Sequence, residues 1–513
     1  MARIARIPER HADRVLAGLA VLAAACGMIV GVGEDRLTLG GSGAQSAPLV
    51  VRVSGATPLS SGANRVAIDV MRSRLEATPG VRSVDLAPIQ HSARTTSITV
   101  GLSKDPKESA AAVSTIEADL DPGPLRISFG GGASELRDAR DETFDDLRLL
   151  LIAVPLAALI LIGALGSRAA LATLFAGATA VLGAGALCIA LSLFVDVSVL
   201  CLVGAAAGGV PASVLLCGLE RRGVEPRALI AATIAAAIVF GSLTALGVGY
   251  LAAVGLGGGL ACLLSAPAAV VAIRAATSLW QLEPRVDTAV HRALGGLVAT
   301  MSWSRAVAVA IAILSAGVVA VIGLPGIRLE PGAFAAPGPP SISTERGLIV
   351  AGSVLLGLFA IGWVAGRRPL AALVTAVCVP LAPAAGVGLA VIVFQDGHLQ
   401  GLLDFDSFSI GVGPLVAGAA TVAAASAAQG LAVIARPDSR DPYSRVFAAA
   451  AAASLVTALA AACLLGSSLE FAKAFGLIVF AGLLLDLLFV RGLVGAALTA
   501  LSNRRDGSLP AAK

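Results

Sequence analysis

The alternation of polar and apolar positions divides the chain into long apolar runs and one insertion, residues 49–132, with the pattern of a soluble domain. Apolar residues at every second position predict four strands in it, and apolar residues three or four positions apart predict two helices. The strand patterns are Leu49, Val51 and Val53, then Val84 and Leu86, then Ile98, Val100 and Leu102, then Leu125, Ile127 and Phe129; the helix patterns are Val66, Val70, Met71 and Leu75, then Val113, Ile116 and Leu120.

The order of these elements is strand, helix, strand, strand, helix, strand, which is that of the ferredoxin-like fold. Breaks at Pro79 and Gly80 and at residues 121–124 separate them, because proline and glycine interrupt regular structure. The insertion is long enough to bury one small core of its own.

Outside the insertion, the apolar runs are long enough to cross a membrane, which takes about twenty apolar residues in a helix. Of the 513 residues, 57% are hydrophobic and 14% are charged, whereas about a quarter of the residues of soluble domains are charged. The expected fold class is therefore a polytopic α-helical membrane protein. Twelve spans are predicted, at residues 15–33, 147–165, 169–193, 197–219, 228–250, 254–276, 304–325, 347–366, 369–394, 408–435, 446–467 and 473–497.

The charges of the loops predict the orientation of the spans, because cytoplasmic loops collect Lys and Arg. If the N-terminus is cytoplasmic, the cytoplasmic loops carry Arg168, Arg221, Arg222, Arg227, Arg285, Arg292, Arg305, Arg367, Arg368, Arg436, Arg440, Arg445, Arg504 and Arg505. We therefore expect a bacterial-type plasma membrane, cytoplasmic N- and C-termini and an extracytoplasmic insertion. The first span is expected to be retained, with a cleaved signal peptide as the alternative.

The spacing of the spans predicts two repeated halves, because one span, an extracytoplasmic segment and five close spans occur twice. The second extracytoplasmic segment is too short for a folded domain. The expected organisation is an N-terminal tail and first span (1–33), a porter-like domain (34–146), spans two to six (147–280), a cytoplasmic amphipathic linker (281–303), span seven (304–325), a short extracytoplasmic loop (326–346), spans eight to twelve (347–499) and a cytoplasmic tail (500–513).

Three local motifs are similar to those of a known transporter family. Residues 130–138, Gly-Gly-Gly-Ala-Ser-Glu-Leu-Arg-Asp, resemble the family's passage from the porter domain into the membrane, and residues 164–168, Ala-Leu-Gly-Ser-Arg, resemble the turn after its second span. The segment from Phe475 to Arg491 resembles its last span, in which a glycine is followed by a buried aspartate and then by an arginine. On these motifs the chain resembles the MMPL branch of the RND superfamily, with the second porter domain missing.

That resemblance implies export of a lipid or another hydrophobic molecule, driven by protons that pass through Asp-Tyr pairs in the fourth and tenth spans. Val210 and Pro211 stand at the matching positions of the fourth span, and the tenth span matches more loosely around Ala428 and Gln429. None of these four side chains carries a proton that it could exchange near neutral pH. Proton coupling by the family's route is therefore not expected, and Pro211 is expected to kink its helix.

Asp486 is the remaining candidate for a proton or substrate role, together with Arg491. A charge inside a span costs at least about 2.5–3.5 kcal/mol unless it is paired or protonated, so an intramembrane carboxylate marks a functional site by default. The alternative is a structural carboxylate near the cytoplasmic surface, capped by water or paired with a neighbour such as Arg491. Five positions separate the two residues, which does not place them on one helix face.

Other chemistry is not indicated. The seven cysteines all fall in apolar runs, so they are interpreted as small hydrophobic residues rather than as disulfides or metal ligands. Glycines 204, 208, 209, 255, 257, 258 and 259 are interpreted as positions of close helix packing rather than as a phosphate-binding loop. No nucleophile, phosphate-loop or zinc motif is present, so neither a cofactor, a metal nor nucleic acid is expected.

Three classes of function remain. The first is an MMPL-like transporter of a hydrophobic molecule, and the second is a transport-inactive relative that acts as a membrane scaffold or sensor, with a homo-oligomer or a partner membrane protein as possibilities. A membrane enzyme comes last, because no paired acid and base lie at one membrane face. A polar cavity lined by Asp486 between the halves would favour transport, and an apolar, closed interface would argue against it.

Overall fold

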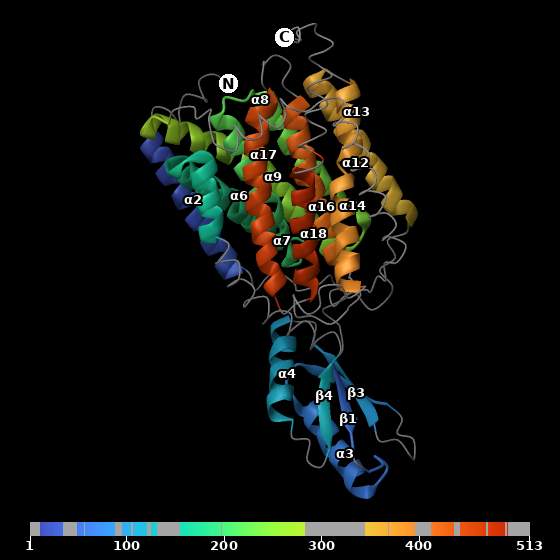
Figure 1. The fold of residues 1–513 in the computed structure, drawn as a ribbon. Helices are drawn as coiled ribbons and strands as arrows, with labels where there is room; N and C mark the ends of the chain where they lie inside the picture. The colour runs from blue at the N-terminus through green and yellow to red at the C-terminus, as the bar shows by residue number, and fades with distance from the viewer. Residues whose placement is uncertain are drawn as a thin grey trace, which may run out of the picture.

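A bundle of apolar helices and a small α+β domain make up the structure, a computed structural model (Figure 1). The structure describes residues 11–33, 49–55, 57–87, 95–103, 106–120, 125–130, 154–195, 197–282, 344–367, 369–395, 412–434, 442–467, 470–487 and 490.

The bundle contains the predicted spans. Its helices are α2 (Ala12–Gly33), α6 (Ser167–Leu191), α7 (Leu200–Arg221), α8 (Pro226–Ser242), α9 (Gly249–Trp280), α12 (Thr344–Gly366), α13 (Pro369–Cys378), α14 (Leu381–Ala390), α16 (Val412–Ile434), α17 (Pro442–Cys463) and α18 (Glu470–Leu485). Within the described ranges, nine helices are long and apolar enough to cross a membrane, and Val154–Leu165 and Phe471–Leu485 are shorter apolar helices. Eleven of the twelve predicted spans thus coincide with apolar helices. The seventh, 304–325, lies outside the described residues, as do most of the predicted linker, loop and tail.

Packing between the helices shows the predicted repeat. In the first half α7, the fourth span, packs on α9, the sixth, as α16, the tenth, packs on α18, the twelfth, in the second half. Likewise α6 packs on α9 as α14 packs on α18. Between the halves, α8 packs on α16 and α7 packs on α17, which are equivalent pairs if the two halves are exchanged. The two halves therefore meet along their fourth, fifth, tenth and eleventh spans.

The small domain has the predicted order of elements. They are β1 (Leu49–Ser54), α3 (Gly62–Ala77), β2 (Val81–Leu86), β3 (Thr95–Leu102), α4 (Pro106–Asp119) and β4 (Arg126–Gly130). The strands form one antiparallel sheet in the order β2-β3-β1-β4, with Val51 opposite both Ile98 and Phe129. This is the strand order of a split β-α-β unit, so the ferredoxin-like prediction is confirmed.

One detail of the small domain corrects the prediction. Val66 and Val70 were expected on the buried stripe of α3 but are 63% and 49% exposed, and the buried positions are Asn64, Ile68, Met71 and Leu75. Those four positions follow the spacing i, i+4, i+7, i+11 of one helix face, and the two valines lie to its side. Asn64 fits this face because its amide donates to the Thr57 hydroxyl at 2.9 Å and to the Pro58 carbonyl at 3.1 Å.

Two basic residues, Arg168 and Arg274, lie near the C-terminal part of α9. Arg168, at the start of α6, donates to the Trp280 carbonyl at the end of α9 at 3.1 Å. Arg274 of α9 forms a 2.8 Å ion pair with Glu220 near the end of α7. The small domain lies at the opposite end of the bundle from the C-terminal end of α9, which is yellow-green in Figure 1. This is the arrangement that the loop charges predict for an extracytoplasmic domain.

Candidate functional site

Asp486 lies inside the second half of the bundle. It follows α18 by one residue and its exposed fraction is 0%. The hydroxyl of Ser426, which is also fully buried, donates a 2.8 Å hydrogen bond to Oδ1 of Asp486. Ser426 is eight residues before the end of α16, so the pair lies about 12 Å from the basic end of that helix at 1.5 Å per residue. Capping by bulk water therefore does not describe this carboxyl group. Arg491, its predicted neighbour, lies outside the described residues.

Helix α16 links three spans of the second half through polar side chains. Ser426 and Gln429 are three positions apart, so they lie on neighbouring parts of one helix surface. Ser426 bonds to Asp486 beyond α18, whereas the amide nitrogen of Gln429 donates to the Ser454 hydroxyl of α17 at 3.0 Å. The rest of α16 is rich in alanine and glycine, so its neighbours approach closely. These two hydrogen bonds define how α16 sits against α17 and α18.

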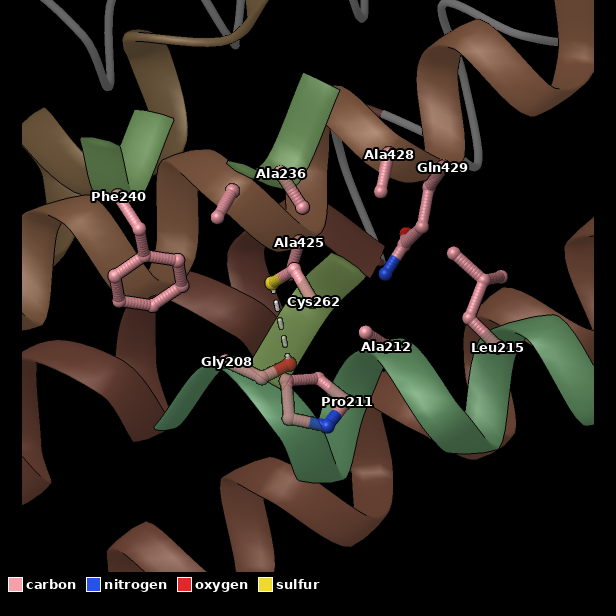
Figure 2. Close-up of a pocket in the computed structure, with 11 residues that line it drawn as sticks. Gly208, Pro211, Ala212, Leu215, Ala236, Phe240, Cys262, Ala425, Ala428 and Gln429 are labelled. Atoms are coloured by element: carbon pink, nitrogen blue, oxygen red, sulfur yellow. Dashed lines mark hydrogen bonds between the residues drawn. The ribbon is translucent and has the colours of Figure 1, made fainter. Parts of the chain in front are cut away.

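A small cavity lies where the two halves meet (Figure 2). Four helices line it, namely α7, α8 and α9 of the first half and α16 of the second. The lining residues are Gly208, Pro211, Ala212, Leu215, Ala236, Phe240, Cys262, Ala424, Ala425, Ala428 and Gln429. Pro211, Ala428 and Gln429 are thus brought together from the two spans in which the sequence placed a missing relay. Val210 does not line the cavity but is half-buried against the main core.

The chemistry of this interface is almost wholly apolar. The space open to the centre of a water molecule is about 10 Å³, and no carboxylate is among the lining residues. Cys262 donates through Sγ to the Gly208 carbonyl at 3.5 Å, and Gln429 contributes the single amide. Asp486 does not line the cavity. In this structure the interface is thus apolar and closed, which argues against a proton relay at the matching positions.

The first half is joined by glycines and by a pair of serines. A Cβ on Gly257 of α9 would collide with the Cys201 carbonyl of α7, and one on Gly204 would collide with the Val254 carbonyl. These glycines therefore allow α7 and α9 to touch backbone to backbone, as predicted. Beside them, Ser213 of α7 donates to the hydroxyl of Ser265 of α9 at 3.0 Å.

Several residues that form these polar contacts were not predicted from the sequence. Ser426 and Ser454 are isolated serines in alanine-rich spans, and nothing local distinguishes them from ordinary small residues. Arg274 is different, because a charged residue inside the predicted span 254–276 was a visible signal, and its partner Glu220 closes the fourth span. None of the seven cysteines forms a disulfide, as expected. In the part of the chain that the structure describes, no group of three His, Cys, Asp or Glu residues could hold a metal ion.

No family model and no curated protein sequence matches the chain. Solved structures do resemble it. SecDF from Thermus thermophilus, described as a translocon-associated membrane protein, gives a TM-score of 0.57 at 13% identity, over 97% of this chain and 100% of that chain. The chain shares the fold of SecDF. A second SecDF structure, in a super-membrane-facing form, gives a TM-score of 0.53 at 12% identity, over 97% of this chain and 99% of that chain.

A heavy metal efflux pump is less similar, with a TM-score of 0.49 at 12% identity over 83% of this chain and 74% of the pump. Because the identities to SecDF are 12–13%, the likeness concerns the fold alone. A multi-pass α-helical membrane fold, which the sequence predicted, is therefore supported.

Proposed function

We propose that this protein is an RND-type membrane transporter for a lipid or another hydrophobic molecule, resembling the MMPL branch, and that Asp486 is its membrane carboxyl group. The observation that carries the proposal is the fully buried hydrogen bond between Ser426 and Asp486, within a fold shared with SecDF. Carboxyl groups are costly inside a membrane, and proteins keep them there chiefly for function.

The Ser426 hydroxyl suits either protonation state of Asp486. A hydroxyl donates to a carboxylate oxygen and accepts from a protonated carboxyl, so the pair remains bonded when a proton binds or leaves. A change at Asp486 would act on α16, which carries Ser426 and also packs on α8 of the first half. Rigid-body displacement of one packed element against another is an established route for such changes. Asp486 would thereby influence the interface without lining it.

A hydrophobic substrate is proposed because the surfaces available to it are apolar. The interface cavity is lined by alkyl and aromatic groups except at Cys262 and Gln429. Helices α2 and α12, at the edge of the bundle, present large exposed apolar side chains such as Val32 (83% exposed) and Val364 (80% exposed). Such faces suit lipid contact, so a lipid could approach the protein within the bilayer.

The second candidate is a transport-inactive relative that acts as a scaffold or sensor subunit. The apolar cavity at Pro211 favours it, because no carboxyl group and no basic side chain is among the residues that line it. SecDF is described as translocon-associated, and by analogy this protein would bind a partner membrane protein or a second copy of itself.

Reconstitution into liposomes separates the two candidates. Movement of a fluorescent lipid is recorded with and without a pH gradient for the wild type, Asp486→Asn and the matched control Asp69→Asn, which alters an exposed aspartate of α3. A transporter that uses Asp486 shows gradient-dependent movement in the wild type and the control but not in Asp486→Asn. Equal behaviour of all three proteins, with no effect of the gradient, contradicts the proposal and favours the scaffold.

A further inference from the structure

Of the side-chain amide of Gln429, only the nitrogen forms a hydrogen bond with a residue that the structure describes. The side chain is 1% exposed, and its nitrogen donates to Ser454 at 3.0 Å. Its Oε1 is buried and accepts no hydrogen bond from any residue that the structure describes. Buried acceptors in native proteins are nearly always paired, with protein or with ordered water. This oxygen therefore calls for a donor.

The donor has a place to bind, because Gln429 lines the cavity between the halves (Figure 2). The space open to the centre of a water molecule is about 10 Å³. One buried water needs roughly 10–15 Å³ by the same measure, together with two to four polar partners. The cavity thus has room for a single water molecule and for little more.

Further polar groups stand on the opposite side of the cavity. The Gly208 carbonyl lines it and accepts a long bond, 3.5 Å, from the Cys262 thiol. A carbonyl oxygen has two lone pairs, so beside its bond within the helix this group can accept one from a water that takes the place of the long thiol contact. Pro211 has no N–H, so the carbonyl of Ala207, four residues before it, loses its usual helical donor. The Gly208 carbonyl of the first half and Oε1 of Gln429 in the second thus both belong to residues that line the cavity.

We propose that the cavity is a binding site for one water molecule, which donates to Oε1 of Gln429 and to the Gly208 carbonyl and so bridges the tenth span to the fourth. An anion does not fit, because the polar groups are mainly acceptors. A metal cation would need several oxygen ligands, whereas most of the lining is alkyl and aromatic. The bridge stands independently of transport, since it requires only that the two halves pack as described.

Hydroxyl-radical footprinting of the full chain in lipid nanodiscs tests the proposal, because radicals formed from a bound water oxidise the side chains beside it. Cys262 should be oxidised several-fold more than Cys217, which is equally buried on α7 but does not line the cavity. In Gln429→Leu the oxidation of Cys262 should fall to the level of Cys217. Equal oxidation of the two thiols in the wild type overturns the water site.

A second variant guards against misfolding of Gln429→Leu. Ala425→Val keeps the amide but fills part of the cavity, and it should also lower the oxidation of Cys262 to that of Cys217. A density map that resolves ordered waters should show one peak within hydrogen-bonding distance of Gln429 in the wild type and none in Ala425→Val. A wild-type map without that peak overturns the proposal. Neither readout depends on transport, so failure here leaves the function of Asp486 to its own experiment.

Discussion

In both halves of the bundle a serine forms a hydrogen bond between equivalent spans, but the partner of the serine differs. In the first half a serine of the fourth span, Ser213, bonds to Ser265 of the sixth at 3.0 Å. In the second half a serine of the tenth span, Ser426, bonds at 2.8 Å to Asp486 at the end of the twelfth. The first pair joins two hydroxyl groups, whereas the second joins a hydroxyl group to a carboxyl group. The repeated architecture thus contains a carboxyl group at this contact in one half and a second serine in the other.

The largest effect is expected from a substitution that disrupts the packing of α7 on α9 in the first half. Gly257→Leu would place a side chain against the Cys201 carbonyl, and overpacking costs about 1–3 kcal/mol even where side chains rather than backbone must move. We expect most of the protein to be lost from the monodisperse peak in size-exclusion chromatography. Gly241→Leu is the matched control, because a Cβ at Gly241 meets nothing within 4 Å. Normal elution of both variants would show that the close packing of α7 on α9 is not needed.

Replacing each of the two serines by alanine measures what its hydrogen bond contributes to stability. Ser426→Ala takes a donor from a buried carboxyl group and should lower the free energy of unfolding by about 1.5–3 kcal/mol, as for hydrogen bonds to charged groups. Ser213→Ala removes a neutral bond and should cost about 0.5–1.5 kcal/mol. Reversible unfolding in detergent measures both. Equal losses would mean that the aspartate is energetically no different from the serine at the other contact.

The smallest effect is expected for the charge pair of the first half. Glu220 and Arg274 form a 2.8 Å ion pair near the basic end, and their side chains are 10% and 29% exposed. Because water and salt screen such pairs, Glu220→Gln should lower the free energy of unfolding by about 1 kcal/mol or less, and by less at high salt. Unfolding curves at two salt concentrations test this. A large, salt-independent loss would make this pair a second buried charged centre and weaken the contrast between the halves.

The architecture could be predicted because each helix and strand has a characteristic length and spacing of apolar positions in the sequence. Eleven of the predicted spans follow from the length of the apolar runs, and the order of elements in the small domain follows from the period of its apolar positions. The burial of α3 was predicted less well. Val66 and Val70 are as apolar as its core residues, and only the sheet beneath the helix selects Ile68 and Met71 instead. Hydrophobicity specifies that one face is buried, and tertiary packing determines which.

The site was predicted in part for a related reason. Asp486 could be identified because a carboxylate is rare in a span, and Pro211 and Gln429 could be placed by their match to the relay positions of the family that the chain resembles. Ser426 and Ser454 could not be identified, because serine is common in membrane helices. Their hydrogen-bond partners lie 60 and 25 residues away in the chain, in other spans. The cavity itself arises from small residues on four helices, a property that no single segment contains.

Infrared difference spectroscopy tests the central claim, that Asp486 is the group of the membrane interior that exchanges a proton. Spectra of the reconstituted protein at acidic and alkaline pH are subtracted for the wild type, Asp486→Asn and Ser426→Ala. The account predicts a protonated-carboxyl band that is absent in Asp486→Asn and displaced in Ser426→Ala, because that variant loses the bond to Oδ1. A wild-type band that Asp486→Asn leaves unchanged would contradict it.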